Sequence, residues 1–221
     1  MKHYQHEHDI ILDEWLVICC RDGDIEMASL LVQRWHPRLA RYALRLTGGD
    51  RDAAADAVQE AWVAIMQGIR GIRDPAAFPA WAYSITRRKA ADWVRQRQRQ
   101  RERQREQQRS DQRQGHVGNL ASGASVSMDR GSPPEGPAHS RTPSDTEASP
   151  EANFDASDER SALHRAIADL PADQRELLML YYIDGFGVQE IARILDVQPG
   201  TVKSRLFRTR AALRDMLEKE G

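Results

Sequence analysis

The stretch between residues 186 and 217 constrains the fold most, because it describes two short helices joined by a tight turn. Apolar residues recur in its first half at the spacing of one buried helical stripe: Val188, Ile191, Ala192 and Leu195. Pro199 suits the first position of a second helix, since its φ is already helical and its missing N–H would have no partner there. The inner stripe of that helix consists of Val202, Leu206, Thr209 and Leu213. The pattern predicts a helix-turn-helix.

The outer face of the second helix is basic. A helical wheel with about 100° per residue places Ser204, Phe207 and Arg208 opposite the buried stripe. Five basic residues and no acidic residue lie between Thr201 and Arg214, which suits a helix in a major groove between two phosphate backbones. A solvated helix in an ordinary bundle is the alternative, and an exposed phenylalanine argues against it. We therefore predict a DNA-reading helix.

Charge is distributed unevenly along the 221 residues. The formal net charge is only −1, which by itself predicts no polyanionic partner. Between residues 87 and 113, however, there are eleven basic and four acidic residues, whereas residues 114–160 contain three basic and eight acidic ones. This segregation predicts basic modules joined by an acidic spacer.

Helical periodicity accounts for most of the other apolar residues, which predicts an all-α fold of two small helical domains. The expected helices cover residues 10–20, 25–46, 51–67, about 76 to beyond 95, about 157–170, and 171–183. Residues 97–157 are rich in Gln and Arg, then in Gly, Ser and Pro, with almost no apolar residue. We expect a flexible, low-complexity linker there, whose Gln/Arg part is able to prolong the fourth helix for some turns.

Two further surfaces emerge from helical wheels. The far side of helix 51–67 collects Asp56, Gln59, Glu60 and Val63, which on its own fits a solvated face. On the fourth helix, Trp81, Ile85 and Trp93 share one side, and a separate basic wedge contains Ser84, Arg87, Arg88, Ala91 and Arg95. Aromatic rings beside arginines fit single-stranded nucleic acid, although buried tryptophans beside surface arginines are a common alternative.

The N-terminal residues bear on the cellular compartment. The N-terminus lacks the order of a signal peptide, and the run 10–20 is too short and too acidic to span a bilayer, which predicts a cytoplasmic protein without membrane insertion. Cys19 and Cys20 are adjacent on an apolar stretch, where a disulfide between neighbours would be strained. Both are expected to be reduced core residues.

Three motifs occur in an order that resembles the extracytoplasmic-function class of bacterial sigma factors. They are Asp56-Ala57-Val58-Gln59-Glu60-Ala61-Trp62, the run from Trp81 to Arg95, and Leu170-Pro171 followed by Gln189-Glu190-Ile191-Ala192 and Gly200-Thr201-Val202-Lys203-Ser204-Arg205-Leu206. The resemblance implies an N-terminal extension helix at 1–23, sigma region 2 at 24–96 and sigma region 4 at 158–221. Such a factor binds core RNA polymerase and promoter DNA. An anti-sigma factor is a further partner of the class, but a partner encoded elsewhere leaves no mark in this chain.

The resemblance also assigns roles to the surfaces. It implies contact with core polymerase for Asp56, Gln59 and Glu60. It implies capture of the opened minus-ten element by Arg70, Arg73, Phe78, Trp81, Arg87, Arg88 and Arg95. It implies recognition of the minus-thirty-five element by Thr201, Lys203, Ser204, Arg205, Phe207 and Arg208. The sequence differs from the family's usual pattern at three places. Arg88 stands where the family commonly has asparagine, and Gly187 stands where a serine or threonine often caps the helix. Asp196 precedes Val197 where the family usually has a glycine before the apolar residue. Glycine still caps a helix and aspartate tolerates a left-handed backbone, so only the promoter preference is affected.

Two other classes of function fit the sequence less well. A stand-alone helix-turn-helix regulator explains only the C-terminal third of the chain, and it would bind duplex DNA without polymerase. An enzyme finds no support, because no phosphate-binding glycine loop, metal-ligand spacing or Ser/His/Asp arrangement stands out. Histidines on the polar N-terminus could hold a metal, but with no cysteine partner a frayed terminus is the better interpretation: His3, His6 and His8. No cofactor or metal is expected.

Overall fold

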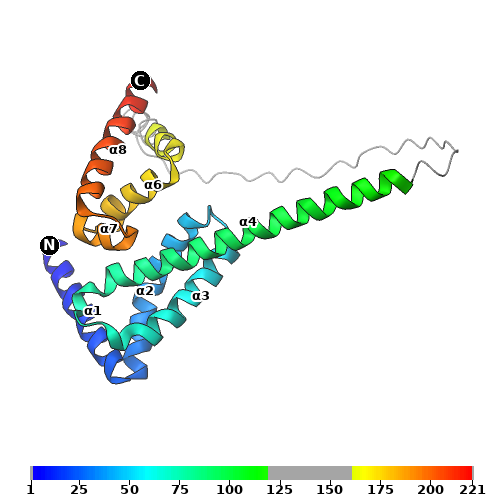
Figure 1. Ribbon diagram of the computed structural model, residues 1–221. Helices are drawn as coiled ribbons and strands as arrows, with labels where there is room; N and C mark the ends of the chain where they lie inside the picture. Colours follow the sequence, from blue (N-terminus) through cyan, green and yellow to red (C-terminus); the bar gives the residue numbers. More distant parts are fainter. Residues whose placement is uncertain (1, 119–160, 221) are drawn as a thin grey trace, which may run out of the picture. The chain divides into compact units, whose positions relative to one another are not determined.

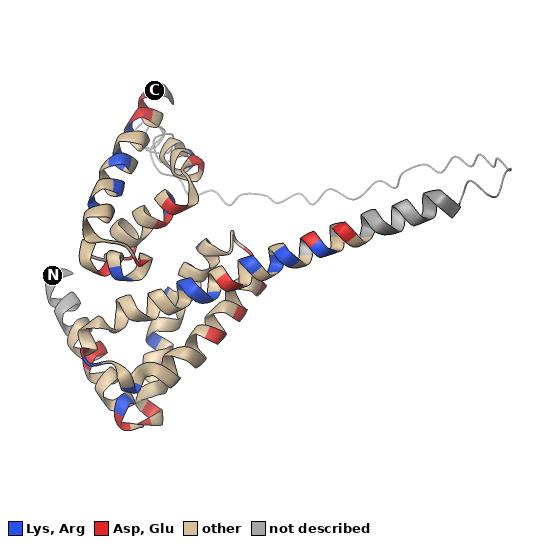
Figure 2. Cartoon of the chain, in the orientation of Figure 1, with Lys and Arg blue, Asp and Glu red and all other residues tan. Residues whose placement is uncertain are grey.

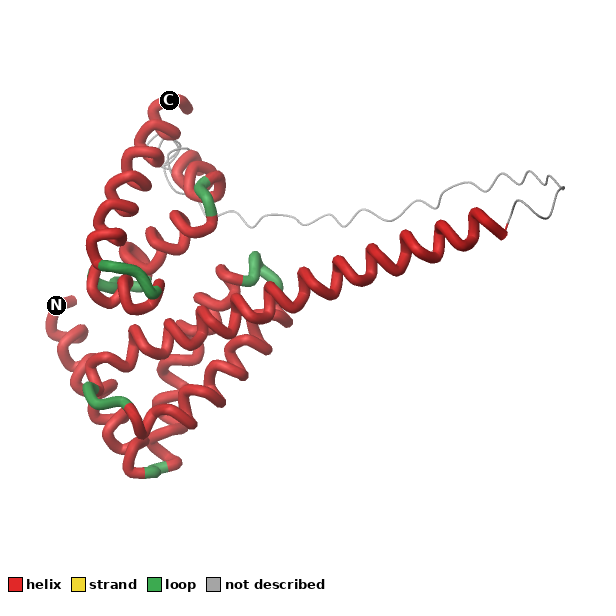
Figure 3. Tube along the Cα trace, in the orientation of Figure 1, coloured by secondary structure: helices red, strands yellow, loops and turns green. Residues whose placement is uncertain are grey.

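The computed structural model describes residues 2–118 and 161–220, and within these ranges it contains helices and loops but no strand (Figure 1, Figure 3). The predicted all-α fold class is confirmed. The chain divides into two compact units. One contains the residues up to Arg97 and those from Ala162 onwards, and the other contains residues from Gln98 to Ser161.

The N-terminal helices pair closely along the sequence. They are α1 (Lys2–Asp22), α2 (Ile25–Leu46), α3 (Arg51–Gly68), the short 3₁₀ turns η1 (Ile69–Gly71) and η2 (Pro75–Ala77), and α4 (Phe78–Gly118). Helix α2 packs between α1 and α3, and α1 also contacts both 3₁₀ turns. Pro37 lies inside α2 without ending it. The buried Trp35 and Leu39 anchor the helix on both sides of the proline.

The C-terminal helices contain the predicted helix-turn-helix. Helical residues 161–169 are followed by α6 (Ala172–Leu178), the π-helical turn η3 (Met179–Ile183), α7 (Val188–Leu195) and α8 (Pro199–Glu220). The single helix expected over 171–183 is therefore an α-helix that widens into a π-turn. Gly185 ends it with a φ of 77°, a left-handed value that glycine adopts without steric cost.

Helix α1 packs into the N-terminal core. Leu16, Val17 and Cys20 are buried. The carboxylate of Asp13, also buried, accepts hydrogen bonds from Arg34 Nε at 2.5 Å and Trp35 Nε1 at 3.1 Å. Both donors lie on α2, so these bonds fix α1 against α2.

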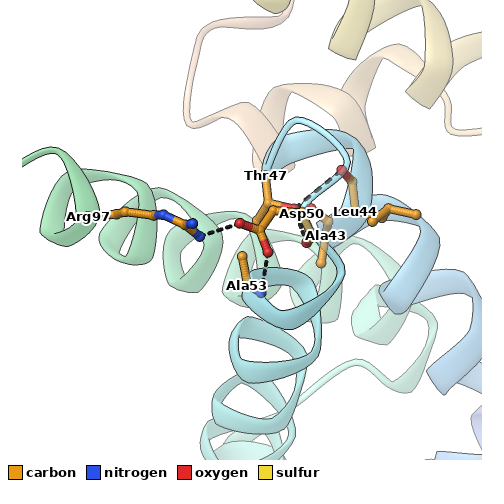
Figure 4. A network of polar contacts seen from close by, with 6 residues as sticks. All are labelled: Ala43, Leu44, Thr47, Asp50, Ala53 and Arg97. Atoms are coloured by element: carbon orange, nitrogen blue, oxygen red, sulfur yellow. Dashed lines mark hydrogen bonds and ion pairs between the residues drawn. The ribbon is translucent and has the colours of Figure 1, made fainter. Parts of the chain in front are cut away.

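A polar network closes the turn between α2 and α3 (Figure 4). The hydroxyl of Thr47 donates to the carbonyl of Ala43 at 3.0 Å, which satisfies a carbonyl at the end of α2. Asp50 caps α3 by accepting a hydrogen bond from the amide of Ala53 at 3.0 Å, and it also pairs with Arg97 of α4. The amide of Ala53, together with Arg97, lowers the pKa of Asp50. One carboxylate thus joins the start of α3 to α4.

Some apolar residues of these helices lie at the surface. Ile25 is 82% exposed because it is the first residue of α2, where no neighbouring turn covers it. Leu30 and Leu163 are also exposed. The buried stripe of α2 instead consists of Leu31, Trp35, Leu39, Tyr42 and Ala43.

The segment expected to be a linker from residue 97 begins as helix, because α4 continues to Gly118. There is no glycine or proline between Pro79 and Gly115, and Gln, Arg and Glu all favour helices. The first turns of this segment follow the expectation that its Gln/Arg part prolongs the fourth helix. The remaining residues of the expected linker, 119–157, lie outside the described residues, as does the start of the helix expected at about 157–170.

Both cysteines are free thiols, as expected. Cys20 is buried, and burial raises the pKa of its thiol to about 11, so this thiol stays protonated at neutral pH. None of the helices in residues 2–118 or 161–220 has the length and apolar character required to cross a membrane.

Replacing Leu39 by alanine should lower the free energy of unfolding of the N-terminal helices by about 2–5 kcal/mol, because a fully buried side chain would leave a cavity. The tryptophan residues, at positions 15, 35, 62, 81 and 93, all belong to these helices, so tryptophan fluorescence in urea reports their unfolding. Gln33→Ala, at an exposed position of the same helix, should change the value by less than about 0.5 kcal/mol. Equal losses for the two variants would contradict the packing described.

Candidate nucleic-acid interface

The turn of the helix-turn-helix has the geometry that its sequence predicts. Asp196 adopts φ 55° and ψ 52°, a left-handed conformation that aspartate tolerates, and the amide of Val197 donates to the carbonyl of Ala192 at 3.0 Å. Gly187 caps α7, and its amide donates to Glu190 Oε2 at 2.8 Å. The backbone therefore accommodates the two departures from the family pattern that lie in the helix-turn-helix, Gly187 and Asp196.

Helix α8 separates a buried face from a basic outer face, as expected. Val202, Leu206 and Thr209 are buried. Phe207, by contrast, is 75% exposed, so a large apolar ring lies on the hydrophilic side of the helix. The other exposed residues predicted for this surface are Lys203, Ser204 and Arg208, while Thr201 and Arg205 are half-buried at its margin.

Two side chains of the outer face of α8 fold back onto their own helix. The hydroxyl of Ser204 donates to the carbonyl of Thr201 at 3.0 Å, and Arg208 Nε donates to the carbonyl of Ser204 at 3.4 Å. Arg210 instead donates from Nε to the hydroxyl of Tyr182 at 2.8 Å and stacks on the ring of Tyr181. This contact was not predicted, because the tyrosines belong to a different helix. Arg210 thus supports the domain, and Arg208 is left as the arginine at the centre of the face.

The arginines predicted for the minus-ten surface lie on the η1–η2 loop and on α4 (Figure 2). Arg70 and Arg73 are exposed on the loop. On α4, Arg88 is exposed, and Arg95 is exposed beside Asp92, to which it donates at 2.6 Å. Arg87 is half-buried and donates from Nε to Glu176 at 3.0 Å.

The aromatic residues of this surface are less accessible than the sequence suggested. The ring of Phe78 is fully buried and packs edge-on against Trp35, with centroids 5.7 Å apart. The assignment of Phe78 to nucleic-acid contact is therefore wrong, and this residue instead anchors the start of α4. Trp81 is half-buried, and a Cβ at Gly68 would lie 2.9 Å from its ring. Because residue 68 is glycine, its backbone can pack directly against the indole. This contact fixes the orientation of the ring, and the part of Trp81 that stays exposed is held in place with it.

The outer face of α3 has the exposure that its wheel position predicts. Asp56, Gln59 and Glu60 are all exposed. Glu60 accepts a hydrogen bond from Lys89 Nζ of α4 at 3.1 Å, a cross-helix ion pair that periodicity alone does not reveal. A groove of about 750 Å³ lies beside this face between α2 and α3, and its lining includes Val32, Ala40, Leu44, Gln59, Trp62 and Val63. An acidic face therefore borders an apolar groove.

Comparison with known proteins accounts for both halves of the chain. The model of sigma-70 region 2 matches residues 31–100, and the model of sigma-70 region 4 matches residues 160–213. The ECF RNA polymerase sigma-E factor of Escherichia coli K12 is 29% identical over 210 residues, which are 94% of this chain and 95% of that protein. The chain belongs to the extracytoplasmic-function class of sigma factors. It is thus a transcription initiation factor that works with core RNA polymerase and promoter DNA.

Two further similarities agree with this family. A probable RNA polymerase sigma factor, RfaY of Xanthomonas campestris pv. campestris, is 31% identical over 169 residues; these are 76% of this sigma factor but 35% of RfaY, so the chain spans about a third of that relative. The solved structure of CnrH in complex with the cytosolic domain of CnrY has a TM-score of 0.56 at 21% identity and covers 95% of this chain and 99% of that one, which shows a shared fold. A stand-alone helix-turn-helix regulator would not account for the region 2 match, so that alternative is set aside.

Proposed function

We propose that this sigma factor docks on core RNA polymerase through the outer face of α3, with Asp56, Gln59 and Glu60 in contact. The support is the exposure of all three side chains next to the apolar groove between α2 and α3. Such a surface suits a partner that combines basic and apolar side chains. The groove would then bury apolar area while the carboxylates fix the orientation.

The opened minus-ten element is captured, in this proposal, by the η1–η2 loop and the exposed side of α4. Arg70, Arg73, Arg88 and Arg95 provide positive charge for phosphates, and the accessible edge of Trp81 provides a stacking surface. Phe78 contributes only by holding α4 in the core. Arg87 is available to DNA only when its hydrogen bond to Glu176 is given up.

The minus-thirty-five element is read by the outer face of α8. Arg208 is positioned for a bidentate contact with guanine, and the exposed ring of Phe207 for a thymine methyl group. The observation that carries the whole proposal is the presence, on one chain, of this basic face, the basic strip of α4 and the acidic face of α3. A promoter-recognition subunit of polymerase requires all three, and it works in the cytoplasm, where polymerase and DNA are found.

An anti-sigma factor remains a predicted partner of this chain. CnrH, whose fold this chain shares, was solved with the cytosolic domain of CnrY bound. A copurification of this sigma factor from its own cells, followed by identification of bound proteins, would show whether a partner of that kind exists.

Replacing Arg88 by alanine tests the minus-ten assignment. With core polymerase present, the variant should bind a template with a single-stranded minus-ten segment several-fold more weakly than wild type, because one phosphate contact is lost. Trp81→Ala should lose about 1–3 kcal/mol on the same template if a base stacks there. Arg214→Ala removes the same charge from an exposed position on α8 and is the control. Equal losses for Arg88→Ala and Arg214→Ala would remove Arg88 from the site.

A further inference from the structure

Most of the C-terminal part of α4 lies beyond the family matches. The region 2 match ends at residue 100 and the region 4 match begins at residue 160, whereas α4 continues to Gly118. We call residues 98–118 the α4 extension. At a rise of 1.5 Å per residue it is about 30 Å long, close to one turn of duplex DNA.

The composition of the α4 extension indicates a polar partner. Residues 98–118 contain six arginines and three acidic residues, an excess of three positive charges (6 − 3), and Val117 is their one apolar residue. A helix without an apolar face cannot be stabilised by burial against a protein core. Acidic residues three positions from arginines, such as Glu102 after Arg99, stabilise the helix itself but leave the excess positive charge unbalanced.

Arginines recur along one side of the helix. Positions 95, 99 and 103 are four apart, so they follow that side with an advance of about 40° at each step. All three side chains are exposed. An exposed basic strip along a helix matches the phosphate backbone at the edge of a DNA groove.

Helix α4 is anchored to the other N-terminal helices as far as Arg97. Arg97 pairs with Asp50 in the turn between α2 and α3 (Figure 4), and its guanidinium lies 4.8 Å from the centroid of the Trp93 ring. The same helix carries Arg88 and Arg95 one to three turns before the extension. The α4 extension is therefore the direct continuation, in the chain, of the helix that carries these arginines.

We infer that the α4 extension binds the duplex DNA between the two promoter elements, through its phosphates and independently of base sequence. The inference rests on the proposed function, since the minus-ten element must lie along α4. In the sequence, the extension lies between region 2 and region 4, the proposed readers of the two promoter elements. The duplex between those elements, the spacer, is therefore the DNA that we assign to the extension.

The test uses holoenzyme assembled from core polymerase and either wild-type sigma factor or a variant in which four arginines become glutamine: Arg99, Arg101, Arg103 and Arg105. Glutamine favours the helix nearly as well as arginine, so the change removes charge and leaves helicity. A second variant replaces the same four residues by lysine. Open-complex formation is measured between 50 and 200 mM salt on two templates of one transcribed promoter, one complete and one whose duplex ends just upstream of the minus-ten element.

On the complete template, the glutamine variant should bind about tenfold or more weakly at the higher salt concentrations. Its plot of log affinity against log salt should be shallower by about 0.9 for each arginine that contacts a phosphate, or about 2–4 in total. On the shortened template it should equal wild type, and the lysine variant should equal wild type on both. Equal binding on the complete template, or an equal loss on both templates, would overturn the inference. Weaker binding to core polymerase alone would assign the extension to a protein contact instead. If wild-type holoenzyme opened neither template, the proposed function would fail first, and this inference with it.

Discussion

Replacing Asp56 and Glu60 together by arginine should abolish binding to core RNA polymerase and leave the helical fold intact. Both side chains are exposed on the outer face of α3, so neither change disturbs the core. The substitutions reverse the charge of a surface proposed to meet basic side chains, and like charges juxtaposed at an interface cost several kcal/mol. Glu60→Arg also removes the ion pair between Glu60 and Lys89, which lies on the surface. Pull-down of core polymerase and far-UV circular dichroism measure the two effects.

The matched control reverses two acidic residues away from this surface, Asp22 and Glu218, and gives the same change in net charge. Both are exposed and lie near the C-terminal ends of their helices, where a positive charge is favourable. The control should bind polymerase as wild type does. An unchanged pull-down for the Asp56/Glu60 variant, or an equal loss for the control, would show that α3 is not the docking surface.

Arg208→Ala should lose about 1–3 kcal/mol of affinity for the preferred upstream element, a factor of roughly 5 to 150, and much less for mismatched elements. The physical reason is that a bidentate contact with a base edge is made only when the correct base is present. Arg208 is exposed beside Phe207 at the centre of the outer face of α8, whereas Arg210 is bound to Tyr182. The measurement is open-complex formation by holoenzyme on matched and mismatched upstream sequences.

Arg95→Ala provides the contrast, because this residue is proposed to neutralise phosphate. Its removal should weaken all promoters alike and reduce the salt dependence by about one counterion. The side chain is exposed and its ion pair with Asp92 is on the surface, so its removal should change the free energy of unfolding little. If Arg208→Ala lost the same factor on every upstream sequence, α8 would grip only the backbone, and the reading of bases would have to be assigned elsewhere.

The sequence predicted well those features that depend on local periodicity and local backbone preference. The bounds of α2, the left-handed Asp196 and the start of α8 at Pro199 all follow from residues within one or two turns. The exposure of Asp56, Gln59 and Glu60 likewise follows from the wheel of a single helix. These features can be predicted without knowing the tertiary contacts between helices.

The sequence failed where the outcome depends on a distant residue. Phe78 is buried because Trp35, from α2, lies against its ring. The ion pairs Lys89–Glu60 and Arg97–Asp50 join residues far apart in the chain, so no local pattern reveals them. The hydrogen bonds from Arg34 and Trp35 to Asp13 likewise join residues far apart in the chain.

The central claim is that this chain directs core RNA polymerase to specific promoters. The most direct measurement is run-off transcription with purified core polymerase on a promoter library, combined with gel shifts of the same DNA with and without core enzyme. We predict discrete transcripts from a subset of promoters sharing two separated elements, with tight DNA binding only when polymerase is present. Two results together would contradict the account: the chain alone binds duplex DNA tightly and sequence-specifically, and adding it to core polymerase yields no new transcripts.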